Sequence, residues 1–485
     1  MMARVPLSEL LHLTPLMTSF RLLLSTLFTA CALTNAVAAA NTQIKNVLFI
    51  ISDDLKATTL GAYGDKVVQT PHIDALARQG MVFTRGYCQG TTCGPSRRSF
   101  MRSRYRDENG ITMGENFINH GYYSARVGKV FHMKVPGDII DGTNGQDVAE
   151  CWTERFNSPG LEAHTPGLYA LYNHDIFTTS LKNRVSTAQH DRWFVSVQYE
   201  GDGSDQPDHK SATKTMELIR KRAKSDQPFF ITTGFVRPHY PNVAPNQYFD
   251  LYPPEKITLP ETREGDLDDV PQLGYTRVTS LNDPIGKYPE NQKKFWGSYY
   301  ATITYMDDQV GRIVAELERQ GLRESTAIVF IGDHGYHLGE HFFWQKSNLH
   351  EDVTRIPFII SAPGFAPGRS DSFVELADIF PTVSELVGIS VPETVQGKSL
   401  VPVLQNADAE VRDEAFTIGN YQDFSIRSAE WAYMLYKDDS EELYDMQNDP
   451  KQFTNLAEDP AYRHVIATQR KRLEARIKAA GLTRG

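Results

Sequence analysis

Four unbroken runs of apolar and β-branched residues do most to limit the folds open to this chain. They occupy residues 46–52, 228–234, 327–332 and 357–361, and the first reads Asn-Val-Leu-Phe-Ile-Ile-Ser. A run of this length without polar alternation predicts a strand that is buried on both faces. Each run therefore predicts one buried strand of a sheet.

Helical patterns lie between the predicted strands. They cover residues 71–80, 211–224 and 295–320. Strands that alternate with helices predict an α/β domain with a largely parallel sheet. Ligands of such sheets bind beyond the carboxyl ends of the strands. Four polar side chains follow strand ends in this way: Asp53, Asp54, Asp333 and His334.

Length and a break in composition predict a second, smaller domain. A chain of 485 residues exceeds one ordinary domain. Residues 362–369 are rich in Pro and Gly, which is typical of a boundary region. We therefore expect a large α/β domain over 41–365 and a smaller C-terminal α+β domain over 366–485. Within the latter, helical or strand patterns cover 377–386, 432–436 and 461–480.

Two long polar loops interrupt the α/β pattern. They cover 135–164 and 242–287 and are rich in Gly, Pro and Asp. Loops of this length commonly serve as lids or as walls of a binding site. They are therefore candidates for a functional lid or a substrate wall.

The N-terminus has the features of a targeting segment. Arg21 precedes an apolar run over 22–33, and small residues including Ala36-Val37-Ala38 follow. This order predicts that residues 1–40 are a cleaved signal peptide and that the protein is secreted or periplasmic. The run is short for a stable membrane span. A faint lipoprotein cleavage box over 27–31 leaves anchoring through Cys31 as the alternative.

The net charge excludes some classes of partner, and the cysteine count excludes a fold held together by disulfides. The formal net charge of −10 argues against nucleic acid and anionic membranes as partners. It does not exclude an anionic substrate, because basic residues and a metal ion can gather locally. Removal of the leader leaves Cys88, Cys93 and Cys151, too few for a disulfide scaffold. An unpaired cysteine in an exported protein requires a chemical explanation.

One cysteine lies in a recognisable motif. Cys93-Gly94-Pro95-Ser96-Arg97 matches the Cys-x-Pro-Ser-Arg signature of sulfatases. From Asn46 onward the chain resembles the sulfatase family of the alkaline phosphatase superfamily. The resemblance is closest to the iduronate-2-sulfatase-like branch, to which 251–260 is also similar. The other matching motifs, in family order, are Asp53-Asp54, Gly128 to His132, Arg237 to His239, Asp333 to Gly335, Gly339 to His341, and Lys346.

The resemblance implies a fold, a reaction and a modification. The fold is an alkaline phosphatase-like large domain with a mostly parallel central sheet flanked by helices. The reaction is hydrolysis of sulfate esters on a sulfated polysaccharide or oligosaccharide, which could contain uronic acid. A formylglycine-generating or sulfatase-maturing enzyme would oxidise Cys93 to formylglycine. The hydrated aldehyde has two oxygens on one carbon, so one can attack sulfur and the other can later expel sulfate.

The resemblance also implies a metal site. Carboxylates are hard ligands that suit calcium or magnesium, and the family favours one calcium ion. Taken alone, Asp53-Asp54 could equally form a turn or a helix cap after a strand. The implied metal residues are Asp53, Asp54, Cys93, Asp333 and His334.

Six residues are assigned to catalysis by the same resemblance. Arg97, Lys129 and Lys346 would contact the diol and the sulfate, alongside Cys93 itself. His132 resembles the residue that helps to deprotonate the sulfated diol. His239 resembles the residue that gives a proton to the leaving alcohol. A histidine suits both tasks because its ordinary pKa lies near neutrality. Three further histidines that could line the pocket are His337, His341 and His350.

Two departures from the family keep alternative functions open. Arg102-Ser103 stand where the family commonly has Thr-Gly, which bears on formylglycine formation. Lys56 stands where the branch often has Arg, which bears on substrate contacts. One alternative is an unmatured, non-catalytic protein that binds sulfated carbohydrate. The other is a phosphatase or phosphodiesterase of the same superfamily, with a Ser or Thr nucleophile and commonly two metals.

Overall fold

The computed structural model describes residues 44–105, 109–184, 193–419 and 422–484. The predicted signal peptide over 1–40, including Cys31, lies outside these residues. Within the described ranges, no helix is both long and apolar enough to cross a membrane.

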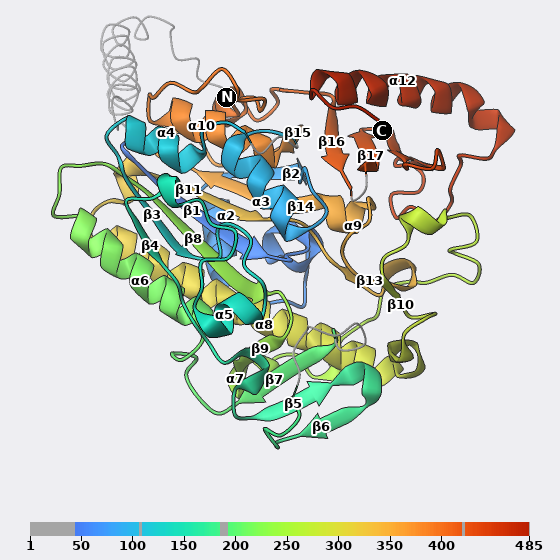
Figure 1. Ribbon diagram of the computed structural model, residues 1–485, viewed down its shortest axis with the longest axis horizontal. Coiled ribbons are helices and arrows are strands. Elements are labelled where there is room, and N and C mark those ends of the chain that lie inside the picture. Colours follow the sequence, from blue (N-terminus) through green and yellow to red (C-terminus); the bar gives the residue numbers. More distant parts are fainter. Residues whose placement is uncertain (1–43, 106–108, 185–192, 420–421, 485) are drawn as a thin grey trace, which may run out of the picture. The chain divides into compact units, whose positions relative to one another are not determined.

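The described part of the chain contains an eight-stranded sheet with the order β15-β2-β14-β11-β1-β8-β3-β4 (Figure 1). Neighbouring strands are parallel except at β14, which runs antiparallel to both β11 and β2. The largely parallel sheet predicted from the sequence is therefore confirmed. Its strands are β1 (Asn46–Asp53), β2 (Met81–Tyr87), β3 (Tyr123–Gly128), β4 (Glu154–Phe156), β8 (Phe229–Pro238), β11 (Thr326–Gly332), β14 (Arg355–Ser361) and β15 (Gly368–Glu375).

Both faces of the sheet are covered, which explains the unbroken apolar runs. Along β1, Leu48 and Ile50 pack into one core cluster, while Phe49 and Ile51 pack into another on the opposite face. Every residue of β1, β8 and β11 is buried. Since successive side chains of a strand point to opposite faces, a strand covered on both sides has no polar face to show.

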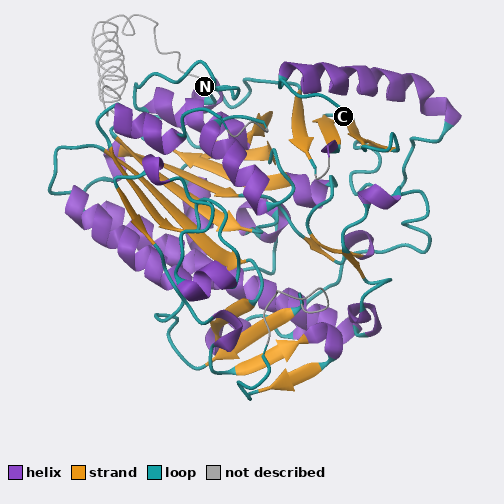
Figure 2. Cartoon of the chain, viewed as in Figure 1, coloured by secondary structure: helices purple, strands orange, loops and turns teal. Residues whose placement is uncertain are grey.

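Helices form the two outer layers (Figure 2). α3 (Cys93–Arg102), α4 (Met113–Asn119) and α10 (Ile379–Leu386) pack on one face of the sheet. α2 (Pro71–Arg78), α6 (Pro207–Arg222) and α8 (Pro289–Arg319) pack on the other. The last three each begin with Pro, whose fixed φ and missing N–H suit the first helical position. They match the helical patterns predicted at 71–80, 211–224 and 295–320, and α10 matches the pattern predicted at 377–386.

Two smaller sheets are formed by short strands that the sequence analysis did not predict. One has the order β6-β5-β7-β9, and the other has the order β10-β13-β12. Short helices accompany them. The elements are β5 (Leu168–Leu171), β6 (Ile176–Thr178), β7 (Val195–Tyr199), β9 (Asn242–Pro245), β10 (Val278–Thr279), β12 (His337–Leu338), β13 (Phe343–Gln345), α5 (Gly137–Asp141), α7 (Asn246–Phe249) and α9 (Glu351–Thr354).

The C-terminal part is an antiparallel sheet covered by a helix. β16 (Glu414–Ile418), β17 (Phe424–Ser428), β18 (Trp431–Leu435) and β19 (Glu441–Asp445) pair in that order, and α12 (Arg463–Ala479) packs on them. α11 (Val401–Gln405) precedes them. β15, which follows the composition break at 362–369, still pairs with β2 in the large sheet. The separate antiparallel sheet thus begins only at Glu414.

Candidate active site

The carboxyl ends of β1 and β11 bring two acidic segments together. The strands are adjacent and parallel, with Ser52 opposite Gly332, so Asp53 and Asp333 follow at the same edge of the sheet. The backbone N–H of Asp333 donates to Ser52 O at 3.1 Å. The register of one strand pair, and not local sequence, thus creates the acidic centre.

Asp54 is held in an unusual backbone conformation at this edge. Its φ is 61°, in the left-handed region that non-glycine residues seldom adopt. Its backbone N–H donates to Asp333 Oδ1 at 3.0 Å, and Tyr299 Oη donates to its carbonyl at 2.6 Å. These two bonds direct the Asp54 carboxylate into the centre. One of its oxygens, Oδ2, is buried without a hydrogen-bond partner.

Cys93 is the first residue of α3 and lies against the acidic centre. Its Sγ is 3.6 Å from Asp54 Oδ1, 3.3 Å from His334 Nε2 and 3.2 Å from Lys346 Nζ. Burial by itself would raise the pKa of the Cys93 thiol. The positive charges of Lys346 and Lys129 stabilise the thiolate, and the net result is a lowered pKa for Cys93. A helix N-terminus and nearby cations are the surroundings in which a thiolate is stabilised.

The other two described cysteines have the opposite character. Cys88, Cys93 and Cys151 are all buried and unpaired. Burial raises the pKa of Cys88 to about 12 and raises that of Cys151 further. Cys93 alone among these three therefore has an environment that favours a charged or reactive form.

Arg97 joins the two acidic segments. It lies one turn after Cys93, and its Nη2 is 2.9 Å from Asp53 Oδ1 while its Nε is 2.8 Å from Asp333 Oδ2. Its Nη1 donates to Val130 O at 3.0 Å and to Lys129 O. The guanidinium is fully buried between the two carboxylates. Arg97 is thus placed to hold them, and its expected contact with the diol and the sulfate stays a prediction.

Two lysines complete the charge balance. Lys129 follows β3 and forms an ion pair with Asp53, and Lys346 follows β13 and forms one with Asp54. Burial would raise the pKa of Asp53, but Lys129 and Arg97 hold it well below its usual range. Burial dominates at Asp54 and raises its pKa to about 7. Three carboxylates and three cations thus offset one another, so an added dication leaves a net positive centre suited to an anion.

The two predicted histidines both border the centre. His239 follows β8, and its Nε2 is 3.7 Å from Asp54 Oδ2. Burial, Lys346 and Lys129 hold the pKa of His239 well below its ordinary value. Its Nδ1 contacts Tyr240 O, which fixes the N–H there and leaves Nε2 with a lone pair. Burial and Lys129 lower the pKa of His132 to about 4, and its Nδ1 has no hydrogen-bond partner.

A cleft of about 670 Å³ opens onto this centre. Four of the six predicted catalytic residues line it: Cys93, His132, His239 and Lys346. Arg97 and Lys129 are fully buried and lie outside its lining. Sequence reasoning missed several other lining residues, among them Arg98, Lys134, Gln146, Tyr240 and Arg277. Arg98 adjoins the signature, whereas Gln146 and Arg277 lie in the two long loops, 135–164 and 242–287, that the sequence indicated as candidate walls of a binding site.

The donor atoms suit a hard cation. Asp53, Asp54, Cys93 and His239 form one group of ligand atoms within 4.8 Å of one another. Cys93, Asp333 and His334 form a second. The five predicted metal residues are thus brought together, and His239 is added. The buried Asp54 Oδ2 has no hydrogen-bond partner, and such an atom fits a ligand of a cation, since buried polar atoms are seldom left unsatisfied.

Lys56 and the three neighbouring histidines lie in a separate buried network. Lys56 is 3% exposed and its Nζ is 3.1 Å from Glu340 Oε1, with Asp352 as its second partner. Lys56 does not line the cleft, so it is not placed to contact a substrate bound there. His337, His341 and His350 are bonded to Asn348, Asp266 and Glu442 respectively, and they do not line the cleft either.

Comparison with solved structures places the fold. BT4656, solved in complex with D-glucosamine-2-N,6-O-disulfate, superposes with a TM-score of 0.69 at 19% identity, covering 90% of this chain and 98% of that one. A phosphonate monoester hydrolase from Silicibacter pomeroyi gives 0.70 at 24% identity, covering 90% and 96%. These likenesses show the fold alone. It is the alkaline phosphatase-like α/β fold.

Sequence comparison then identifies the family. The family model described as Sulfatase matches residues 45–389, and that described as N-sulphoglucosamine sulphohydrolase, C-terminal, matches 339–479. Human iduronate 2-sulfatase is 32% identical over 409 residues, which cover 73% of this chain and 71% of the relative. The chain belongs to the sulfatase family, and it is a sulfuric ester hydrolase.

Proposed function

We propose that this protein hydrolyses sulfate esters of sulfated carbohydrates, using a formylglycine made from Cys93 and one calcium ion. The observation that carries the proposal is the position of Cys93, whose Sγ lies within 3.6 Å of Asp54, His334 and Lys346 at the floor of the cleft. The residue that the sulfatase signature marks for oxidation thus adjoins the best group of metal ligands. The name of the human relative supports a carbohydrate substrate.

The two implied groups have defined chemistry. The thiol sulfur of Cys93 stands where the two oxygens of hydrated formylglycine would be, one to attack sulfur and the other to expel sulfate. Calcium would be held by Asp53, Asp54, Asp333 and His334. There it would supply positive charge that stabilises the anionic transition state. Formation of the formylglycine requires a maturing enzyme as a partner.

The chain's own residues would orient the sulfate and move protons. Lys346 lines the cleft beside Cys93, and its ammonium can bind a sulfate oxygen as charge accumulates in the transition state. The ion pair with Lys129 keeps the Asp53 carboxylate ionised. We assign His132 to the removal of a proton on the formylglycine side and His239 to the leaving alcohol. The pKa of His239 is lowered, so a neutral imidazole could not donate a proton. A bound sulfate anion must raise this pKa before His239 can act as an acid.

The two alternatives are less well supported. A phosphatase of this superfamily would carry Ser or Thr at the nucleophile position, which is Cys93 here. A non-catalytic binding protein would require that Cys93 stay unmodified. Ser103, part of the departure from the family motif, ends α3 with φ 53°, and its Oγ donates to Ala377 O at 2.6 Å. The serine at this position therefore has a structural role at the end of α3. Its departure from the family motif does not by itself imply that activity was lost.

The first test is metal dependence. Chelation is expected to abolish sulfate release, and calcium should restore it better than zinc because the donors are mainly carboxylates.

Asp54→Asn should weaken calcium binding by more than ~100-fold, since loss of a direct ligand exceeds the effect of a supporting residue. Metal content by elemental analysis and affinity by calorimetry would measure this. Asp408→Asn makes the same change at an exposed position in the C-terminal part and should have no effect. Full metal content in Asp54→Asn would show that the ion lies elsewhere.

The second test separates the two histidines by leaving group. A sugar alcohol leaves poorly and needs an acid, whereas an activated aryl alcohol does not. His239→Ala should therefore lower sugar sulfate hydrolysis by ~10²- to 10⁴-fold and aryl sulfate hydrolysis by much less. His132→Ala should lower both, because its step follows either substrate. Single-turnover rates of each variant on both substrates show which histidine acts on the leaving alcohol. Equal losses for His239→Ala would remove it as the acid and leave Lys346 as the next candidate.

A further inference from the structure

A second cavity lies between α8 and the small sheet β6-β5-β7-β9, which are neighbours in Figure 1. Its volume is about 450 Å³, which is within the range of ~300–1,000 Å³ that is common for ligand pockets. Residues 249–254 close one side, so part of the branch-like segment 251–260 borders it. The cavity and the active-site cleft have no lining residue in common.

The small sheet directs one of its two faces into this cavity. Leu168 and Gln198 are cross-strand neighbours, as are Ala170 and Ser196, and all four line the cavity. Val197, between the two β7 residues, packs into a separate core cluster. Since successive residues of a strand point to opposite faces, the cavity occupies the face that is turned toward α8.

Small residues keep the space open. Ala170 and Ser196 line the cavity from the sheet, and Gly297 and Ser298 line it from α8. All four are buried. Protein interiors are ordinarily close-packed, so an interface between a sheet and a helix is filled by larger side chains. A gap of this size with small residues on both sides has the character of a ligand pocket.

The wall combines aromatic rings with hydrogen-bonding groups. Phe249 is half-buried and Phe177 is 40% exposed, so both present ring surface to a ligand. Lys294 Nζ lies 4.8 Å from the centroid of the Phe177 ring. Deeper in the wall, Tyr172 Oη and Ser196 Oγ share a hydrogen bond of 2.7 Å. The cavity is therefore neither wholly apolar nor wholly polar.

Two polar side chains of the wall are available to a ligand. Within the described part of the chain, neither Gln198 nor Asp250 forms a side-chain hydrogen bond or an ion pair. Asp250 is exposed and Gln198 is half-buried. Asp250 and Lys294 are the two charged residues of the lining, and their charges are opposite. The cavity thus offers hydrogen bonds without a net charge that would select an anion or a cation.

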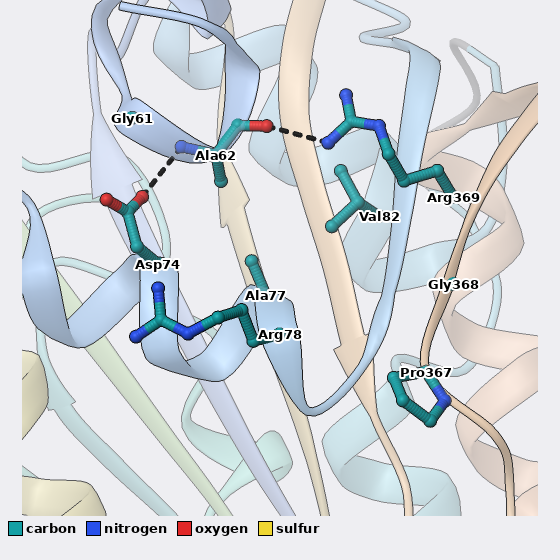
Figure 3. A pocket seen from close by; sticks show the side chains of 9 residues that line it. All are labelled: Gly61, Ala62, Asp74, Ala77, Arg78, Val82, Pro367, Gly368 and Arg369. Carbon is teal, nitrogen blue, oxygen red and sulfur yellow. Dashed lines mark hydrogen bonds between the residues drawn. The ribbon is translucent and has the colours of Figure 1, made fainter. Parts of the chain in front are cut away.

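The cavity in Figure 3, of about 470 Å³, uses its polar groups differently. There Arg369 donates to Ala62 O at 2.8 Å, and Asp74 accepts from Ala62 N at 2.7 Å. These two side chains serve the protein's own backbone. None of the nine residues that line it, all within the described ranges, is aromatic. A similar volume alone therefore does not make a binding site.

We propose that the cavity between α8 and the small sheet binds an uncharged sugar residue of a glycan, at a distance from the reacting centre. A sugar ring has C–H faces that can pack on Phe177 and Phe249, and hydroxyls that both donate and accept hydrogen bonds. An apolar ligand would instead desolvate Gln198 and Asp250 without giving them partners, which costs free energy. The site does not depend on the proposed reaction.

The first test is direct binding. Calcium-loaded protein with unmodified Cys93 is titrated calorimetrically with three uncharged probes: cellotriose, xylotriose and β-1,4-galactotriose. We expect at least one to bind with a Kd of ~1 mM or tighter. p-Cresol, an apolar aromatic probe, should bind more weakly than that saccharide. Failure of all three saccharides to bind, or tighter binding of p-cresol, would overturn the proposal.

Variants of the wall show where the saccharide binds. Gln198→Ala and Asp250→Ala should each weaken its binding by ~3- to 10-fold, through the loss of one hydrogen bond. Gln247→Ala and Asp408→Ala make the same changes at exposed positions outside the lining and should leave the affinity unchanged. Ala170→Leu places a larger side chain in the cavity and should abolish binding, with thermal unfolding as the check of its fold. Parental affinity in both Gln198→Ala and Asp250→Ala would place the saccharide elsewhere and refute the proposal.

A separate measurement keeps this result apart from the proposed function. Sulfate release from an aryl sulfate is measured with matured, calcium-loaded protein and with its Gln198→Ala variant. Gln198 does not line the active-site cleft, so the two rates should be equal. Saccharide binding without sulfate release would refute the proposed reaction and uphold the sugar site. Sulfate release without saccharide binding would uphold the reaction and refute the sugar site.

Discussion

Cys93→Ser is expected to fold like the parent protein and to lose sustained turnover of sulfate esters by at least ~10³-fold, as when a member of a catalytic unit is removed. A serine hydroxyl can attack sulfur once. It has no second oxygen on the same carbon, so the resulting ester can be cleared only by external hydrolysis. The parent protein, made with a maturing enzyme, should carry formylglycine at this position.

Three measurements check this prediction together. Peptide mass spectrometry reports the state of residue 93, steady-state assays report turnover, and thermal unfolding reports the fold. Cys88→Ser is the matched control, because Cys88 is also buried and unpaired but has a raised pKa, and its Sγ lies 3.7 Å from Val353 O. It should retain activity. Parental turnover in Cys93→Ser, or an unmodified Cys93 in fully active protein, would contradict the mechanism.

Arg97→Met is expected to destabilise the protein by about 3–5 kcal/mol and to lose calcium binding. The guanidinium is fully buried between Asp53 and Asp333, at 2.9 Å and 2.8 Å. Without it, neighbouring carboxylates repel one another in a site that excludes water. Excess calcium should restore part of the lost stability, because a bound dication takes over some of the missing charge.

Chemical unfolding with and without calcium measures both effects, and neither depends on maturation of Cys93. Arg126→Met is the control, since Arg126 is also a buried arginine, with its Nε 3.1 Å from Asp147 Oδ2. It should lose stability but keep its calcium affinity. An Arg97→Met protein with parental calcium affinity would show that the arginine does not organise the metal ligands.

Much of the fold followed from local sequence. Residues 46–52 and 327–332 are apolar without alternation because helices cover both faces of the sheet, and that pattern is visible without any partner. The helical patterns at 71–80 and 295–320 were equally clear. The short strands over 168–199 escaped prediction, since β5, β6 and β7 span only a few residues each and depend on pairing with distant segments.

The sequence by itself determined the chemistry of the centre: a signature around Cys93, acidic residues at two strand ends and histidines in family order. Only the tertiary structure decided how these side chains meet. The register of β1 against β11 sets Asp53 beside Asp333, although 279 positions separate Asp54 from its Asp333 partner atom. Likewise, Arg97 faces the carboxylates and not the cleft, and Arg98, Lys134 and Arg277 converge from three segments. The physical reason is that residue type and periodicity are local properties of a chain, whereas contact between remote residues arises from strand pairing and burial.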